Sequence, residues 1–294
     1  MDLKEFMEMM EKNRRIKETL TKMDFSEFVA SRGKGDCMDK LKEVRKNTIP
    51  LKTIPCSDED IPIGGSKIGG YPDLPESIPY PTFSGYTETR VLNGSCTRYE
   101  ESAMQLALQL DLSDAAPFDR DHKLPESGFL YIFWSGEFPL VNNKYCTFDF
   151  DSDNNTPYKI IYFNGDKSQL KRTAPPCPYY SNLDAPLEVK KITIDECKYE
   201  YDKSKLESIL YSPNDATDIA DKLSDDYGTW EINGHKLFGY HTGSMNVSDP
   251  PKGYINLFQF SYHVGCIWDI YWFINEEALA SLDFDRSYIN CDMD

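Results

Sequence analysis

Two short stretches decide how this chain is built: Ser66-Lys67-Ile68-Gly69-Gly70-Tyr71 and His235-Lys236-Leu237-Phe238-Gly239-Tyr240. Each is followed by an apolar segment with a central glutamine, which is Gln109 in the first case and Gln259 in the second. An aromatic segment comes next in both, Leu130-Tyr131-Ile132-Phe133 and Ile270-Tyr271-Trp272-Phe273. Because three matches occur in the same order, the sequence predicts an internal duplication with two related halves packed as one domain.

The segments around these motifs have the composition of strands. Aromatic and β-branched residues recur in short runs that are bounded by turn formers. We predict strands at residues 105–112, 128–134, 145–150, 158–163, 187–194, 254–260 and 267–274. Short helices are predicted at 203–211, 215–223 and 275–282. The expected fold class is therefore α+β, β-rich and mostly antiparallel, with N-terminal helices.

Apolar residues at helical spacing occupy the first part of the chain. Leu3, Phe6, Met7 and Met10 share one face, and the pattern continues through Ile16, Leu20, Met23, Phe25, Phe28 and Val29. Such a stripe predicts helices that bury one face, including one at Met38–Lys46. We expect residues 1–46 to be a helical extension packed on its own domain, and a partner-binding helix is the alternative. Residues 47–294 are expected to form one domain, with half one at about 47–170 and half two at about 187–294.

The first motif is part of a longer stretch, Ser66-Lys67-Ile68-Gly69-Gly70-Tyr71-Pro72-Asp73-Leu74-Pro75. This stretch resembles the S-K-x-G-G-x-P-D-L-P pattern of YwqG-like proteins, a bacterial family with a domain of unknown function. The segments at 108–112, 124–131 and 235–284 are similar to later parts of that family. The second half departs from the pattern, because Phe238 replaces a glycine and Trp268-Asp269 lacks the glycine between them. The resemblance implies a β-rich domain with an internal duplication and implies no activity.

The net charge of the chain limits the kinds of partner that it can bind. It carries 32 Lys and Arg against 49 Asp and Glu, a formal net charge of −17. Nucleic acids and anionic membranes are bound through a surplus of Lys and Arg, so this charge argues against both. An acidic surface favours a basic protein partner, because opposite charges speed association. Solubility alone is the competing explanation.

The spacing of the cysteines and the N-terminal sequence indicate the cellular compartment of the protein. No two of the eight cysteines are closer than 19 residues, so close zinc-ligand pairs such as C-x-x-C are missing. We expect mostly buried free thiols, because a chain of this size can build a core without disulfides. Charged residues recur through Arg15, unlike a secretory signal, and no apolar run has the length of a membrane span. These features predict a cytoplasmic protein.

No sequence motif defines a reaction or a cofactor. The glycine-rich stretch at 64–70 lacks the spacing of a phosphate-binding loop, and the four histidines form no H-x-x-x-H pair. Asp149, Asp151 and Asp153 begin like a calcium loop, but Asn154 and Ile160 stand where such a loop has Gly and Glu. Calcium binding there stays open, as does a cysteine–histidine dyad. We expect no metal site and no cofactor, and we favour a protein without catalysis.

Two functions from different classes remain, beside a third possibility, a structural stress or housekeeping protein with no discrete site. The first is a non-enzymatic protein-binding protein of the immunity or regulatory type. The alternative is a small-molecule-binding protein or enzyme with a site at the seam between the halves. A cleft would form at such a seam, and clefts between subdomains are common ligand-binding sites. The polar candidates for that site are Lys67, Gln109, Lys236, Gln259 and Asp269. For the two glutamines we favour a structural role, with each amide bonded to a neighbouring loop such as the glycine turn.

Overall fold

The computed structural model divides the chain into two compact units. Unit 1 contains Met1–Thr48 and Lys198–Asn233, and unit 2 contains Ile49–Cys197 and Gly234–Asp294. The structure describes residues 10–12, 25–83, 86–87, 97–98, 101–136, 157–179, 187–201, 203–212, 214, 218–219, 222, 234–241, 250–264 and 267–293. Residues 198–233, which the sequence analysis assigned to half two, are thus grouped with the N-terminal segment.

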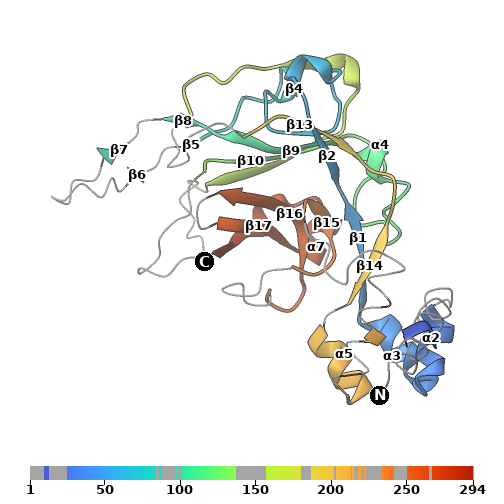
Figure 1. Ribbon diagram of the computed structural model, residues 1–294. Helices are drawn as coiled ribbons and strands as arrows, with labels where there is room; N and C mark the ends of the chain where they lie inside the picture. Colours follow the sequence, from blue (N-terminus) through green and yellow to red (C-terminus); the bar gives the residue numbers. More distant parts are fainter. Residues whose placement is uncertain are drawn as a thin grey trace. The chain divides into compact units, whose positions relative to one another are not determined.

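The described residues of unit 1 form helices and one pair of strands. Its elements are α2 (Phe25–Ser31), η1 (Gly35–Cys37), α3 (Met38–Glu43), the start of β1 (Arg45–Pro50), β14 (Lys198–Tyr201) and α5 (Lys203–Leu210). β1 and β14 pair antiparallel. Phe28, Val29 and Leu41 are buried against Leu206 and Leu210 of α5, so the apolar side chains of α2 and α3 face a core of their own unit. Figure 1 shows α2, α3 and α5 side by side.

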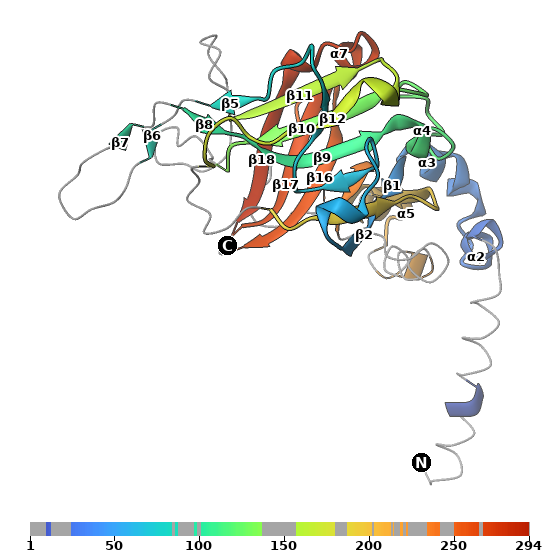
Figure 2. The same cartoon turned by 90° about the horizontal axis from the view of Figure 1, so that it is seen from above.

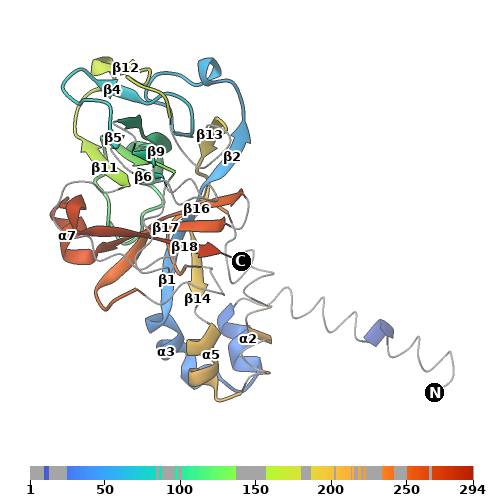
Figure 3. The same cartoon turned by 90° about the vertical axis from the view of Figure 1, so that its left-hand side faces the viewer.

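Unit 2 contains two larger antiparallel sheets. The first sheet has the order β11-β10-β9-β3-β13-β2, seen from above in Figure 2. Its strands are β2 (Lys52–Pro55), β3 (Lys67–Ile68), β9 (Gln105–Asp111), β10 (Phe129–Trp134), β11 (Tyr158–Phe163) and β13 (Lys190–Thr193). The second sheet contains, in this order, β15 (Lys236–Phe238), β16 (Tyr254–Val264), β17 (Ile267–Asn275) and β18 (Ser287–Met293). Figure 3 shows β9 and β11 in one layer, with β16 and β17 in another.

Short elements surround these sheets. The small strand pairs are β4 (Asp73–Pro75) with β12 (Leu170–Arg172), β5 (Thr82–Phe83) with β8 (Ser102–Ala103), and β6 (Tyr86–Thr87) with β7 (Thr97–Arg98). The helical turns of unit 2 are η2 (Asp58–Asp60), α4 (Leu112–Ala115), η3 (Lys167–Gln169), α7 (Glu276–Ala280) and η4 (Phe284–Arg286). Among the described residues, no helix combines the length and the apolar character needed to cross a membrane.

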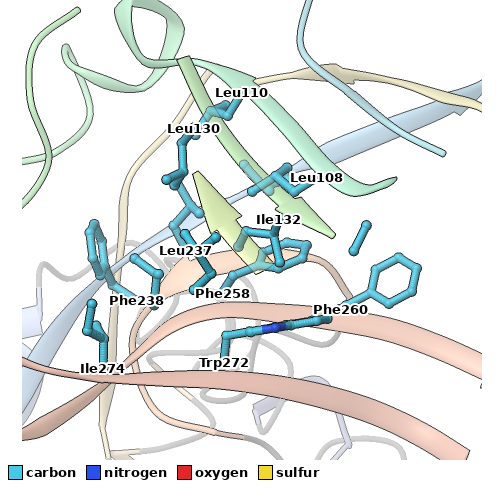
Figure 4. Close-up of a cluster of buried hydrophobic side chains, with 14 of the residues drawn as sticks. Leu108, Leu110, Leu130, Ile132, Leu237, Phe238, Phe258, Phe260, Trp272 and Ile274 are labelled. Atoms are coloured by element: carbon cyan, nitrogen blue, oxygen red, sulfur yellow. The ribbon is translucent and has the colours of Figure 1, made fainter. Parts of the chain in front are cut away.

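The two sheets share one apolar core. Side chains of a strand alternate between its two faces, and in β10 the even-numbered Leu130, Ile132 and Trp134 enter this core. In β17 the core side chains are Ile270, Trp272 and Ile274. Figure 4 shows Leu108, Leu110, Leu130 and Ile132 directed toward Leu237, Phe258 and Trp272. The seam between the sheets is thus filled with apolar side chains, and we call it the shared core.

Most sequence-predicted strands are confirmed within the described residues. The predictions at 105–112, 128–134, 158–163, 187–194, 254–260 and 267–274 correspond to β9, β10, β11, β13, β16 and β17. The predicted helices at 203–211 and 275–282 correspond to α5 and α7. The strand at 145–150, most of the helix at 215–223 and the apolar residues of 1–24 other than Met10 lie outside the described residues.

Three predicted boundaries are wrong by three or four residues: β13 begins at Lys190 instead of 187, β16 continues to Val264 instead of 260, and one helix ends early. The helix expected over Met38–Lys46 ends at Glu43, because Arg45 and Lys46 already pair with β14 as part of β1. Pro50 at the end of this strand and the β-branched Thr48 and Ile49 fit an extended segment better than a helix. The cysteine prediction is half right. The five described cysteines are free, but only Cys291 is fully buried.

Candidate functional site

Lys67 lies on β3 at the centre of a buried cluster of charged side chains in unit 2. Its neighbours across the sheet are Lys191 on β13 and Gln109 on β9. The side chain is fully buried, and its Nζ donates to Asp58 Oδ1 at 2.7 Å and to the carbonyl oxygen of Tyr71. Burial lowers the pKa of Lys67 below its usual value and outweighs the opposite effect of Asp58.

Asp73 on β4 is the second buried charge of this cluster. Its carboxylate accepts hydrogen bonds from Arg172 Nε, from Gln109 Nε2 and from the backbone N–H of Gly64, at 2.8, 2.8 and 2.9 Å. Burial alone would raise the pKa of Asp73, but the bonds from Arg172 and Gln109 prevail and hold that pKa below its usual value. Asp73 is therefore ionised at neutral pH.

Arg172 and Gln109 complete the cluster. Arg172 Nη2 donates to the carbonyl oxygen of Ile61 at 2.9 Å, and its guanidinium also lies 3.4 Å from Asp58. Gln109 Nε2 donates to the carbonyl oxygen of Gly65 at 2.8 Å, and Gln109 Oε1 accepts from the N–H of Asp73 at 2.7 Å. This confirms the expected bond between the glutamine and the glycine turn.

We call the set of Lys67, Asp58, Asp73, Arg172 and Gln109 the Lys67 network. Two cations face two carboxylates, so the network is neutral. Its polar groups bond to one another and to backbone groups between Asp58 and Asp73. The arrangement holds that segment against the sheet, as a structural scaffold does.

Lys236 and Gln259 form a second pair with the same local geometry. They lie opposite each other on β15 and β16, as Lys67 and Gln109 do on β3 and β9. Lys236 Nζ donates to the carbonyl oxygen four residues ahead, that of Tyr240, at 2.6 Å. Gln259 Nε2 donates to the carbonyl oxygen of Gly234, two residues before the lysine, at 3.3 Å. Both relations repeat those of Lys67 with Tyr71 and of Gln109 with Gly65.

Two further features repeat between the pairs. The backbone N–H two residues after the glutamine donates to the side chain just before the lysine: Asp111 to Ser66 Oγ at 3.0 Å, and Ser261 to His235 Nδ1 at 3.2 Å. The second and third residues after each lysine have positive φ, +67° and +71° for Gly69 and Gly70, and +62° and +75° for Phe238 and Gly239. Phe238 therefore adopts a backbone conformation that favours glycine.

Asp269, the fifth predicted site residue, lies on β17 opposite Ser261. Its carboxylate accepts a hydrogen bond from Ser261 Oγ at 2.6 Å, and the residue is 9% exposed. This bond lies near His235, because the Ser261 N–H donates to His235 Nδ1. Asp269 is thus placed with the second pair, two positions along the strand from Tyr271, which faces Gln259.

The structure does not bring the five predicted residues together at the seam. In β9 and β16, Gln109 and Gln259 alternate with Leu108, Leu110, Phe258 and Phe260, which enter the shared core. The glutamines and their lysine partners therefore point to the opposite face of each sheet. Lys67 and Gln109 form one cluster, and Lys236 and Gln259 form another. Whether any of these residues binds a ligand stays a prediction.

Sequence reasoning missed three members of the Lys67 network. Asp73 stands in the quoted motif, and its spacing from Lys67 could have suggested a buried partner. Asp58 and Arg172 give no such signal, because Arg172 is 99 residues away from Asp73 in the chain. In the part of the chain that the structure describes, no group of three or more His, Cys, Asp or Glu side chains could hold a metal ion. Asp149, Asp151 and Asp153 lie outside that part.

Comparison with known proteins gives a family but no activity. None of the curated proteins matches the chain. A family model described as "Domain of unknown function (DUF1963)" matches residues 66–293. The match begins at Ser66 and includes both lysine–glutamine pairs, so the expectation of a domain of unknown function is confirmed. The chain belongs to the DUF1963 family.

Proposed function

We propose that this protein is a non-enzymatic binding protein whose partner is a basic protein. The observation that carries the proposal is the Lys67 network. Its charges neutralise one another, so it offers no free acid, base or nucleophile to a reaction. At the same time it fixes a partly buried segment whose residues 57, 59–60, 62–63 and 71 are exposed, and a fixed backbone is what a recognition surface needs. We call residues 57–71 the Lys67 loop.

The Lys67 loop presents apolar side chains to solvent. Tyr71 is 44% exposed and Ile63 is 42% exposed. The backbone N–H of Tyr71 donates to Asp58 Oδ2 at 2.9 Å, which ties the exposed ring to the buried network. An aromatic side chain on a fixed backbone loses little entropy on binding, and tyrosine is frequent among the residues that dominate protein interfaces.

The same loop carries negative charge for a basic partner. Glu59 and Asp60 are exposed, and a hydrogen bond from the Ser57 hydroxyl holds the pKa of Glu59 below its usual value. An arginine of a partner can stack on Tyr71 while its charge pairs with Glu59. The net charge of −17 also favours a positively charged partner.

Several finer features belong to this proposal. Five free cysteines support a reducing compartment, and we propose the cytoplasm. An immunity or regulatory role fits a protein that neutralises a cationic partner. The Ser66–Pro75 stretch supports a place among the bacterial YwqG-like proteins. The alternative, a small-molecule site at the seam, has less support because apolar side chains fill the shared core.

We also propose that the two sheets arose by internal duplication. The repeated register, hydrogen bonds and φ angles of the two lysine–glutamine pairs support it. Superposition of β3-β9-β10 on β15-β16-β17 tests the idea. Lys67, Gln109 and Tyr131 are expected to fall on Lys236, Gln259 and Tyr271. A better fit in any other register would contradict a duplication.

Affinity capture from native lysate tests the proposed function. The expected result is one stoichiometric protein with a basic pI, released by about 0.5 M salt because screening weakens exposed charge pairs. Tyr71→Ala and Glu59→Lys should each reduce its recovery at least about tenfold. Glu126→Lys, which makes the same charge change at an exposed site elsewhere in unit 2, should retain it. Recovery of no stoichiometric partner, or of one indifferent to both loop variants, overturns the proposal.

A further inference from the structure

Unit 1 contains a cleft that the proposed function does not use. It has a volume of about 260 Å³ and is lined by α2, α3, β1 and β14. Phe25, Leu41 and Tyr201 form its buried wall, and Lys42, Arg45 and Tyr199 lie at its more exposed side. We call it the unit 1 cleft.

The wall of the unit 1 cleft is aromatic and fixed. The rings of Phe25 and Tyr201 lie 5.8 Å apart at an angle of 44°, and Leu41 behind them is fully buried. Tyr201 pairs with Arg45 in the register of β14 and β1. Because these side chains belong to the core of unit 1, the wall needs no rearrangement to receive an apolar group.

Both charged residues of the lining are cations. The Arg45 guanidinium carbon lies 4.2 Å from the centre of the Tyr199 ring, and among the described residues Arg45 has no carboxylate partner. Lys42 is exposed and its Nζ lies 3.2 Å from exposed Asp39. The surrounding segment 32–46 has six basic residues and three acidic ones, the reverse of the balance in the whole chain. The guanidinium edge is therefore available to an anion.

We propose that the unit 1 cleft binds an acidic peptide segment of another protein, with a bulky apolar side chain beside a carboxylate. The apolar side chain packs on Phe25 and Tyr201, and the carboxylate accepts hydrogen bonds from Arg45. Charge complementarity argues for the acidic peptide. The volume of the cleft is below the roughly 300–1,000 Å³ of pockets for drug-sized molecules, which favours single side chains of a peptide. The proposal rests on unit 1 alone and is independent of the Lys67 loop.

Three blocked tripeptides test the proposal on the full-length protein. One has phenylalanine between two aspartates, the second has phenylalanine between two asparagines, and the third has alanine between two aspartates. Binding is followed by NMR shifts of unit 1 amides at low salt. The first peptide is expected to bind with a dissociation constant near or below about 1 mM, and each of the others at least about tenfold more weakly.

Matched variants locate the interaction. Arg45→Gln removes the proposed anion donor at an exposed position and should weaken the first peptide about tenfold without changing the unfolding midpoint. Lys191→Gln removes one positive charge from an exposed site of unit 2 and should leave binding unchanged. The proposal is overturned if the first peptide does not bind at about 10 mM, if the asparagine peptide binds equally well, or if the two variants behave alike.

Discussion

At the scale of single residues, the most unusual feature is a fully buried lysine whose charge is balanced inside the protein. Lys67 is desolvated, which lowers its pKa, and it is held by Asp58 and by the carbonyl oxygen of Tyr71. A buried ion pair contributes little net stability, but removing one partner leaves an uncompensated charge. The network therefore constrains the position of the Lys67 loop more than it stabilises the fold.

Replacing the buried lysine tests this account. Lys67→Met is expected to lower the free energy of unfolding by about 3–5 kcal/mol, because Asp58 and Asp73 then share only Arg172. Urea unfolding followed by fluorescence measures the change. Lys191→Met, at the exposed position opposite Lys67 on β13, should change the free energy by less than about 0.5 kcal/mol. Equal effects of the two substitutions would show that Asp58 and Asp73 do not depend on Lys67 to compensate their charge.

Substitutions at two glycines with positive φ can distinguish the cost of backbone strain from the cost of a steric clash. Gly69 has φ +67°, and a Cβ there would lie 2.5 Å from the carbonyl oxygen of Glu188. Gly253 has φ +85°, but its nearest neighbour would be Asn275 Nδ2 at an ordinary 3.6 Å. Gly253→Ala should therefore cost about 1–2 kcal/mol of unfolding free energy from strain alone. Gly69→Ala should cost clearly more, because the backbone of residues 187–188 must also move. Equal losses of unfolding free energy for the two variants, measured by urea unfolding, would show that a Cβ at position 69 does not clash with the backbone of residues 187–188.

The sequence can predict the role of a residue when that role depends on neighbouring strands or turns. A glutamine in an apolar strand must satisfy its amide nearby, and Gln109 does so at Gly65. Arg172 could not be predicted, because its contact with Asp73 depends on the pairing of β4 with β12 across 99 residues. The site at the seam was expected from the same glutamines. Side chains alternate along each strand, and the two glutamines point away from the shared core. Which face of a sheet packs on the other sheet is decided by the tertiary fold, so the sequence alone could not show this.

At the scale of elements, the hydroxyl of Tyr158 links the two sheets of unit 2 by hydrogen bonding to Ser287, between β11 and β18. Tyr158 on β11 is 5% exposed, and its hydroxyl donates to the carbonyl oxygen of Ser287 on β18 at 2.6 Å. Burial raises the pKa of Tyr158 to about 12, so the hydroxyl stays a donor at neutral pH. The bond links an edge strand of the first sheet to a strand of the second.

Removal of this hydroxyl measures the contribution of the link. Tyr158→Phe should lower the free energy of unfolding by about 1–2 kcal/mol, because the buried carbonyl oxygen of Ser287 loses a donor. Tyr162→Phe removes a hydroxyl from the same strand whose bond to Ser127 is exposed, and it should cost less than about 0.5 kcal/mol. Thermal unfolding of both variants is the measurement. A Tyr158 variant as stable as the Tyr162 variant would mean that water replaces the donor.

Strands with a clear composition could be predicted, and strands defined only by their neighbours could not. β10 and β17 are runs of aromatic and aliphatic residues, and the sequence places both within two residues. β2 and β14 are short and rich in charged or polar residues, so they look like loops until β13 and β1 pair with them. The end of α3 was missed for the same reason, because Arg45 and Lys46 continue the helical pattern and only the pairing with β14 makes them extended.

At the scale of the whole molecule, the shared core couples the two sheets of unit 2. Phe258 of the second sheet is fully buried and stacks on Trp272, with ring centres 5.5 Å apart. The same cluster contains Leu108 and Ile132 of the first sheet. A cavity opened in one sheet therefore removes contacts from the other.

Hydrogen exchange can detect this coupling. Phe258→Ala should lower the free energy of unfolding by about 3–5 kcal/mol and accelerate amide exchange in β9 and β10 as well as in β16. Ile54→Ala, at a site that is 58% exposed on β2, should leave exchange in all three strands unchanged. Faster exchange confined to the second sheet would show that the sheets unfold separately.

The shared core also makes unit 2 suited to reassembly from pieces. Among the described residues, much of the apolar face of each sheet packs against the other sheet, so a fragment with one sheet would expose a large apolar surface. Two such fragments, fused to separate proteins, would regain their fold only on meeting each other. A scaffold whose halves are individually incomplete and mutually complementary is the starting point for a split reporter, and the buried Trp272 would signal reconstitution through its fluorescence.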